Sequence, residues 1–168
     1  MTRNRLLLAA PALVSALLLG CGYYLQYFEN QDPCPLCLVQ RAFYYLVLVT
    51  FAVAAVHDPA KRTVNATYCV AAAVFALGGA AVAARHVWLQ HLPADQVPAC
   101  GPDLYFMLEN LPLARTLEKL FMSTGQCAEV NWRLLGLSIA EWSLAWFVAL
   151  TLYALWLALQ GSKAVRSS

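Results

Sequence analysis

The sequence predicts an all-α membrane protein, a bundle of four transmembrane helices with two loops on one side, the second loop carrying a short amphipathic helix. Three observations lead to this fold class: an apolar composition, four long apolar segments and an uneven distribution of basic residues. Of the 168 residues, 61% are hydrophobic and 12% are charged, whereas a soluble domain has roughly 45–50% apolar and about 25% charged residues. Residues 1–168 are therefore expected to form one integral membrane domain. The formal net charge of +2, without a dense Lys/Arg cluster, gives no indication of a nucleic-acid partner.

Four segments have the length and composition to cross a bilayer, which takes about 20 mostly apolar residues. They run over about 6–25, 38–56, 64–85 and 142–159. The third is rich in Ala and Gly, which suits close helix approach in lipid. Two loops, over about 27–37 and 88–141, then emerge on the same side of the membrane.

The basic residues predict the orientation. An even number of spans places both termini and the loop between the second and third spans on one side. The basic residues of that side are Arg3, Arg5, Lys61, Arg62, Lys163 and Arg166. The first loop of the other side contains Glu29 and Asp32 but no Lys or Arg. Basic residues next to short loops stay in the cytoplasm, so both termini are expected to be cytoplasmic.

The N-terminus allows a second interpretation. Arg3 and Arg5, an apolar run over 6–19 and then Gly20 and Cys21 also resemble a lipoprotein signal that ends at a lipid-modified cysteine. Cleavage at that cysteine would leave three spans instead of four, and the mass of the intact protein distinguishes the two cases.

The six cysteines fall into two groups. Cys21 and Cys69 lie inside predicted spans, where a thiolate would be costly, and we interpret them as small apolar side chains without a redox role. The other four lie in the two outer loops: Cys34, Cys37, Cys100 and Cys127. In a bacterium that side of the inner membrane is the oxidising periplasm.

The two loop pairs differ in what a disulfide would achieve. A bridge between Cys100 and Cys127 would close a long loop and stabilise the protein by about 3–4 kcal/mol, so a structural role and a redox role are both open for that pair. Cys34-Pro-Leu-Cys37 closes too short a loop for such a gain, and its spacing suits thiol–disulfide exchange. A zinc site is the other possibility, but the histidines are poorly placed along the chain, and we expect no metal ion.

Arg41 follows Cys37 by four residues, so the two side chains share one face of the second span. Cys37 is also near the N-terminus of that helix, where unpaired N–H groups favour an anion. Both effects favour the thiolate, and we predict that Cys37 rather than Cys34 carries the charge in the reduced pair. The alternative is that Arg41 only extends to the interface. His86 ends the third span on the same side, where a histidine is more often an interface residue than a functional one.

The electron acceptor is expected to be lipid-soluble. The sequence contains no Gly-rich phosphate loop and no Cys-x-x-Cys-His haem motif. A reactive thiolate beside a cation at the membrane surface fits a quinone, whose reduction places negative charge on oxygen. The amphipathic stretch over 103–122 either lies in the interface plane, holding the second cysteine pair near the membrane, or packs as an ordinary loop helix.

Taken together, the chain resembles the disulfide bond formation protein B (DsbB) family of bacterial inner membranes over nearly its whole length. The residues that carry the resemblance are Cys34-Pro-Leu-Cys37, Arg41, His86, Cys100, Cys127-Ala-Glu, Trp132 and Leu135-Gly-Leu. Pro35, which stiffens the turn between the first two cysteines, departs from the family pattern, and its effect on the potential has no predictable sign.

The resemblance implies an electron relay. A periplasmic DsbA-type dithiol would attack Cys100, the released Cys127 would attack Cys34, and Cys37 would emerge as the thiolate that reduces ubiquinone or another membrane quinone. In that scheme Arg41 would stabilise the charge on the thiolate and the quinone.

His86 would line the quinone site of that relay.

Two alternative functions remain. One is a non-enzymatic scaffold with permanent loop disulfides, and the other is an enzyme of the vitamin K epoxide reductase type, against which the stretch after Cys127 argues.

Overall fold

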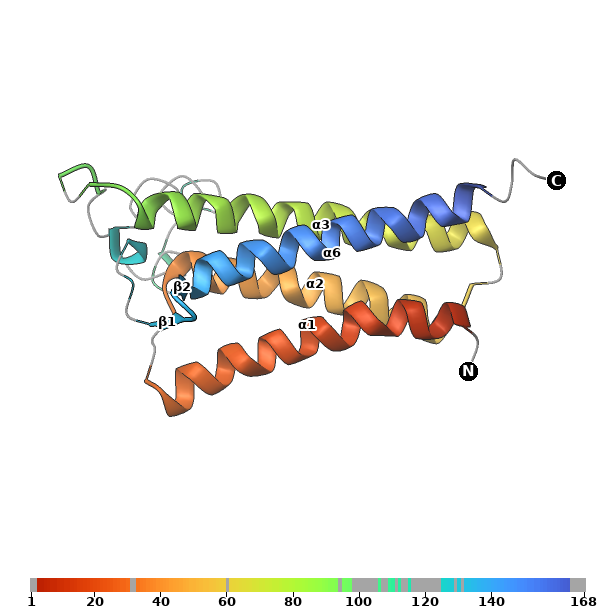
Figure 1. Ribbon diagram of the computed structural model, residues 1–168, viewed down its shortest axis with the longest axis horizontal. Helices are drawn as coiled ribbons and strands as arrows, with labels where there is room; N and C mark the ends of the chain where they lie inside the picture. Colours follow the sequence, from red (N-terminus) through yellow and green to blue (C-terminus); the bar gives the residue numbers. More distant parts are fainter. Residues whose placement is uncertain are drawn as a thin grey trace.

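The computed structural model describes residues 3–30, 33–59, 61–93, 95–97, 106, 109–110, 112, 115, 125–128, 130 and 132–163. Its main elements are four long helices: α1 (Arg3–Phe28), α2 (Pro35–His57), α3 (Arg62–Gln90) and α6 (Ile139–Lys163) (Figure 1). Each is long and apolar enough to cross a membrane, which confirms the predicted four-span helical bundle. The start of α1, the end of α6 and the turn between α2 and α3 lie at one end of the bundle (Figure 1).

The helices are longer than the predicted spans, chiefly at the loop end. The helix that contains the third predicted span continues beyond His86 for one more turn, to Gln90. The second helix begins at Pro35 rather than near residue 38. Hydropathy detects only the part of a helix that lies in lipid, so it misses polar turns that continue beyond the apolar run. The predicted amphipathic stretch over 103–122 lies, for the most part, outside the described residues.

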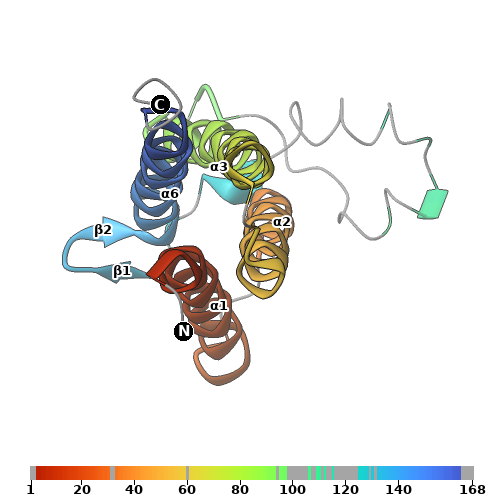
Figure 2. The same ribbon diagram turned by 90° about the vertical axis from the view of Figure 1, so that its right-hand side faces the viewer.

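The packing order follows the chain, since each long helix packs on the one before it. In the view along the bundle, α2 lies between α1 and α3, and α6 packs along α3 (Figure 2). A hydrogen bond from the Tyr153 hydroxyl to the Leu7 carbonyl, 3.1 Å long, ties α6 to α1. Toward its C-terminal end, α1 diverges from α2 (Figure 1). The bundle is therefore tighter at the end with the termini than at the end with the cysteine loops.

Two glycines of α3 allow large rings to pack closely. A Cβ atom added at Gly79 would overlap the ring of Phe147, and one added at Gly78 would lie 2.7 Å from the ring of Phe43. Phe147 is fully buried and stacks on Tyr44 with ring centroids 4.0 Å apart. The small residues predicted to bring helices together in lipid thus receive aromatic side chains from α2 and α6.

A short hairpin leads into α6. Strands β1 (Arg133–Leu134) and β2 (Leu137–Ser138) pair antiparallel across Leu135 and Gly136, whose φ angles are +54° and +85°. Two consecutive positive φ values are typical of the tight turn that matches strand twist, with glycine favoured there. The hairpin places Ser138 directly before the first residue of α6.

Ser138 then caps that helix. Its Oγ accepts a hydrogen bond from the Glu141 N–H, at 3.3 Å, and the Glu141 carboxylate accepts one from the Ser138 N–H, at 2.7 Å. This is the reciprocal capping box expected of a Ser-x-x-Glu sequence. The hydroxyl proton of Ser138 stays available for another acceptor, and the hydroxyl donates it to the side chain of Gln90 on α3.

Candidate functional site

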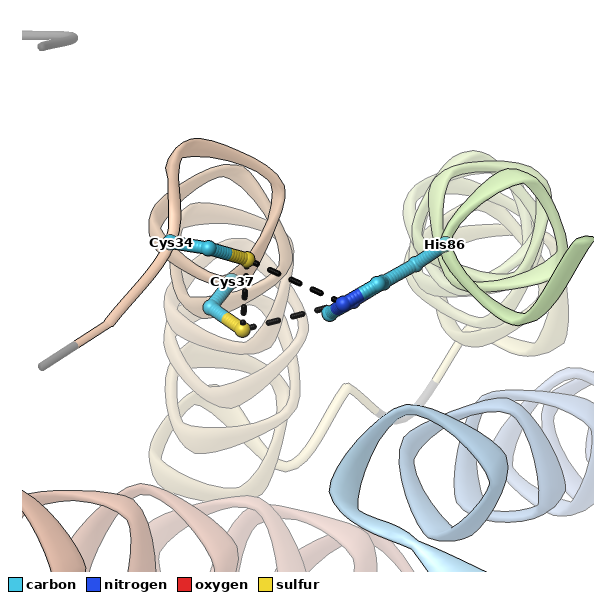
Figure 3. A group of neighbouring side chains, drawn as sticks. All are labelled: Cys34, Cys37 and His86. Atoms are coloured by element: carbon cyan, nitrogen blue, oxygen red, sulfur yellow. Dashed lines mark hydrogen bonds between the residues drawn. The ribbon is translucent and has the colours of Figure 1, made fainter. Parts of the chain in front are cut away.

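The cysteines of the first loop lie at the start of α2. Cys34 is the N-cap residue, with extended backbone angles (φ −65°, ψ 163°), and Pro35 follows in the first helical positions, where its missing N–H costs nothing. Cys37 lies in the first turn, and its Sγ is 3.1 Å from that of Cys34 (Figure 3). The structure therefore shows the dithiol, with two sulfurs that need to approach by only about 1 Å to form a bond of about 2.05 Å.

His86 projects from α3 toward both sulfurs (Figure 3). Its Nε2 atom is 3.8 Å from Cys34 Sγ, and its Nδ1 atom is 4.0 Å from Cys37 Sγ. The side chain is 4% exposed. The judgement that the histidines are poorly placed for the cysteines was based on chain position and is wrong for His86, because α3 and α2 are neighbours and this ring faces the pair.

Cys127 approaches Cys34 from the second loop. It ends the short 3-10 helix η1 (Gly125–Cys127), is 1% exposed, and forms a buried cluster with Leu36 and Leu89 against which Cys34 packs. Hydrogen bonding of the Cys34 thiol to the Cys127 sulfur raises the pKa of Cys34 to about 12; Cys37 opposes the shift and burial adds to it. Cys34 is thus a protonated thiol in contact with two other cysteines. Cys100 lies outside the described residues.

Arg41 is directed toward α1. Its guanidinium donates to the Gln26 side-chain oxygen and, at 2.9 Å, to the Gly22 carbonyl, and it lies 4.7 Å from the centre of the Tyr23 ring. The sequence placed Arg41 on the face of Cys37. In the structure the two residues line one cavity, but the hydrogen bonds of Arg41 join α2 to α1.

That cavity lies at the loop end of the bundle, where α1 diverges from α2. It measures about 160 Å³ and is bounded by all four helices and by residues of the second loop. Its wall combines the redox pair, one cation, one imidazole and apolar side chains. The lining residues used below are Leu18, Leu19, Cys34, Cys37, Arg41 and His86. A cavity of about 150 Å³ admits one benzene-sized ring, so a single ring with small substituents fits this volume.

Two glutamines hold the His86 ring. The Ser138 hydroxyl donates to Gln90 Oε1 at 2.7 Å, which turns the Gln90 NH₂ group toward His86 Nε2, 3.5 Å away. On the other side, the amide nitrogen Nε2 of Gln40 lies 3.1 Å from His86 Nδ1. A neutral imidazole has one donor and one acceptor nitrogen. Because Gln90 presents a donor to Nε2, the proton belongs on Nδ1, and the Gln40 amide accepts it once its oxygen faces the ring.

Gln40, Gln90 and Ser138 were not recognised as site residues in the sequence. Two signals were available. Gln40 is a polar residue in an apolar span, 4% exposed in the structure, and Ser138 begins a Ser-x-x-Glu pattern. Neither signal reveals that both residues converge on His86, because that depends on how the helices are rotated about their axes.

The other two cysteines lie elsewhere on the described helices. Cys69 is fully buried in the apolar core of the bundle, as expected of a small apolar side chain. Cys21 is on an exposed face of α1, where the outer surface of the bundle is apolar. Chemically, the arrangement brings together a vicinal dithiol, a third sulfur beside it and an oriented imidazole at one cavity.

The protein-family comparison matches residues 4–157 with the family described as "Disulfide bond formation protein DsbB". A relative from Hahella chejuensis is 47% identical over 153 residues, which cover 91% of each chain. One from Nitrosococcus oceani is 48% identical over 141 residues, or 84% of this chain and 83% of the relative. A third, from an Azoarcus species, is 44% identical over 157 residues, or 92% and 93%. All three carry the name disulfide bond formation protein B.

Proposed function

The chain belongs to the DsbB family and is a disulfide-generating membrane oxidoreductase, and we propose that it oxidises the dithiol of a periplasmic DsbA-type thioredoxin-fold protein and passes the electrons to a membrane quinone such as ubiquinone. The observation that carries the proposal is the position of Cys34, which contacts Cys37 on one side and Cys127 on the other. A sulfur between two others is the junction that a disulfide relay requires.

The relay proceeds by three exchanges. A thiolate of the partner attacks Cys100 in a Cys100–Cys127 disulfide, a mixed disulfide forms, and Cys127 leaves as the thiolate. Cys127 then attacks Cys34 in a Cys34–Cys37 disulfide, and Cys37 leaves with the electron pair. The second thiol of the partner attacks the mixed disulfide, and Cys100 leaves as the partner departs oxidised. Each exchange forms one S–S bond and breaks one, so the two electrons of the partner dithiol end on this chain. Thiol–disulfide exchange of this kind proceeds through a thiolate nucleophile.

The cavity residues fit a quinone ring. Its volume accommodates one ring, Leu18 and Leu19 provide apolar wall, and Arg41 and His86 provide a cation and a hydrogen-bonding nitrogen for the ring oxygens. A bound quinone accepts two electrons and two protons. On this chain, Cys37 supplies the electrons from the cavity wall, Arg41 stabilises negative charge, and His86 holds a proton at Nδ1 while Nε2 faces Cys34.

The location follows from the same proposal. The bundle lies in the bacterial inner membrane with both termini in the cytoplasm, because the described basic residues Arg5, Lys61 and Arg62 belong to the end of the bundle opposite the cysteines. The cysteine end then faces the oxidising compartment. A strongly oxidising partner, with a potential of about −120 mV, needs an acceptor of still higher potential, as a quinone provides.

A scaffold with permanent loop disulfides is not favoured. The relatives of this chain are named for disulfide bond formation. A Cys34–Cys37 disulfide would also close too short a loop to stabilise the fold appreciably.

The test uses the purified full chain, a reduced thioredoxin-fold protein and a soluble quinone analogue. Wild-type protein should reduce the analogue at the expense of the partner dithiol, and Cys37→Ser should abolish the reaction. Cys21→Ser, on the exposed face of α1, is the matched control and should keep the wild-type rate. If Cys37→Ser retains the activity, the proposed exit of electrons is wrong. A Cys127→Ser protein should accumulate a covalent partner complex through Cys100, which a scaffold would never form.

A further inference from the structure

We propose that the reduced site binds a thiophilic divalent cation, such as Zn²⁺ or Cd²⁺, and that this binding arrests the enzyme in its dithiol state. The cation ligands are Cys34 Sγ, Cys37 Sγ and a ring nitrogen of His86, which all lie within 4.8 Å of one another. Cation binding itself depends only on this geometry, while its effect on turnover rests on the proposed function.

The distances are close to those of a tetrahedral zinc site. With Zn–S bonds of about 2.3 Å and Zn–N bonds of about 2.0–2.1 Å, tetrahedral ligands are separated by about 3.6–3.8 Å. The two sulfurs are 3.1 Å apart, and Cys34 Sγ is 3.8 Å from His86 Nε2. Small rotations of the cysteine side chains therefore bring the three atoms to bonding positions without moving α2 or α3.

Cys127 is the nearest candidate for a fourth ligand, and it would be the third sulfur. It is 1% exposed and hydrogen-bonded to Cys34, so it lies at the edge of the same group. Three cysteines and one histidine form one of the common structural zinc sets. Its sulfur is not one of the three ligand atoms that lie within 4.8 Å of one another, so the fourth position belongs to water, or to Cys127 after its side chain moves closer and loses its own thiol proton.

The glutamines prepare the imidazole for this role. A metal-bound histidine donates its second N–H to an acceptor that fixes the ring. The structure places Gln40 Nε2 at 3.1 Å from Nδ1, and a half turn of this amide brings its oxygen to the same position as the acceptor, which leaves Nε2 of His86 for the cation. The contact of Nε2 with Gln90 is 3.5 Å long and is the weaker of the two, so the cation displaces it at little cost.

Binding is tied to the redox state. Coordination by the pair releases the two thiol protons of Cys34 and Cys37 to solvent, and no electrons move. Disulfide sulfurs are not thiolates, so the oxidised pair lacks the ligands. A cation on Cys37 blocks the transfer of its electrons, and one on Cys34 blocks attack by Cys127. Inhibition should therefore grow when the electron acceptor is scarce and the dithiol persists.

The experiment titrates Cd²⁺ into the detergent-solubilised full chain. The chain is first reduced with a phosphine, which is removed without air, and bound metal is followed by the thiolate-to-cadmium absorption and by calorimetry. We expect one Cd²⁺ per reduced chain, displaced by Zn²⁺, and at least a 100-fold weaker affinity for the oxidised chain. His86→Asn should weaken binding at least tenfold, and Gln40→Leu should weaken it by about 10–100-fold, as outer-shell partners typically do.

The matched controls are His91→Asn and Cys21→Ser, which change an exposed histidine and an exposed cysteine and should leave the affinity unchanged. Helix content by circular dichroism shows whether each variant is folded. Equal affinity of reduced and oxidised chains, or equal losses in His86→Asn and His91→Asn, would overturn the proposal. If the reduced chain does not bind Cd²⁺ but still reduces the quinone analogue, the metal site is wrong and the proposed function stands. If it binds Cd²⁺ but does not reduce the analogue, the proposed function is wrong and the metal site stands.

Discussion

Nδ1 of His86 lies 3.1 Å from the side-chain amide of Gln40, and both side chains are 4% exposed. This contact joins α2 and α3 immediately below the two redox sulfurs. Because the Ser138–Gln90 hydrogen bond orients the amide that faces Nε2, the proton belongs on Nδ1, and Gln40 accepts it when its amide turns the oxygen to the ring.

Replacing Gln40 tests that relationship. Gln40→Leu leaves a buried N–H without an acceptor, which should cost about 1–3 kcal/mol in the free energy of unfolding. It should also slow the reduction of the quinone analogue, because the His86 ring loses the partner of its Nδ1 atom. Gln40→Glu places an oxygen at Nδ1 and should retain more activity than Gln40→Leu. A leucine variant with the wild-type rate would show that Gln40 has no positioning role.

The protonation of Cys34 should depend on Cys127. With its pKa raised to about 12, about one Cys34 side chain in ten thousand is the thiolate at pH 8, and its alkylation should be slow and accelerate about tenfold per pH unit. Cys127→Ala removes the largest cause of the shift, so alkylation of Cys34 at pH 8 should accelerate at least tenfold. Peptide mass spectrometry of reduced protein treated with iodoacetamide gives the rate. An unchanged rate would mean that Cys127 does not control this thiol.

The same shift predicts how stability varies with pH. The folded protein binds the Cys34 proton more tightly than the unfolded chain, whose thiol has a pKa of 9.0. The contribution of Cys34 is therefore complete below pH 9 and is lost as the pH rises from 9 toward about 12. Thermal melts of the reduced protein should show this loss, and Cys34→Ser should reduce it.

Arg41 should contribute to quinone binding through its charge and through its contacts with α1. Arg41→Met removes both, and we expect KM for the quinone analogue to rise at least tenfold, about 1.4 kcal/mol of binding. Arg41→Lys keeps the charge but cannot reproduce the planar two-donor geometry, so its KM should lie between those of wild type and Arg41→Met. Gln26→Leu removes one partner of Arg41 and leaves the charge in place. If Gln26→Leu raises KM as much as Arg41→Met does, the contacts matter more than the charge.

The close approach of α3 and α6 predicts a strong dependence on the size of residue 79. In Gly79→Ala the added methyl would overlap the Phe147 ring, and such overpacking costs about 1–3 kcal/mol. Gly20→Ala, with no atom within 4 Å of the added methyl, is the matched control and should be neutral or slightly stabilising, since alanine favours helix. Thermal unfolding in detergent compares the two. Phe147→Leu should partly rescue Gly79→Ala, and equal melting of both glycine variants would contradict the packing described.

Hydropathy was sufficient to predict the number of helices, because an uncharged run of about 20 residues has few alternatives to crossing the bilayer. It could not locate the last turn of α3, which carries Gln90, since polar residues there look like loop. The spacing of Cys34 and Cys37 indicated exchange chemistry without any structure. The contact of Cys34 with Cys127 depends on the fold of the second loop, which no local pattern encodes. The sequence also could not predict that the Arg41 side chain is directed toward α1, because this depends on how α1 packs on α2.

The capping box of α6 has a consequence for how substitutions combine. Ser138 begins the last helix and, with the same hydroxyl, orients the glutamine that faces His86. A substitution of this serine removes the cap of α6 and the hydrogen bond that orients Gln90 at the same time. The stability of the helix end and the orientation of the imidazole therefore change together. Substitutions at the start of α6 and around the histidine of α3 are therefore expected to have non-additive effects, although about fifty positions of sequence separate them.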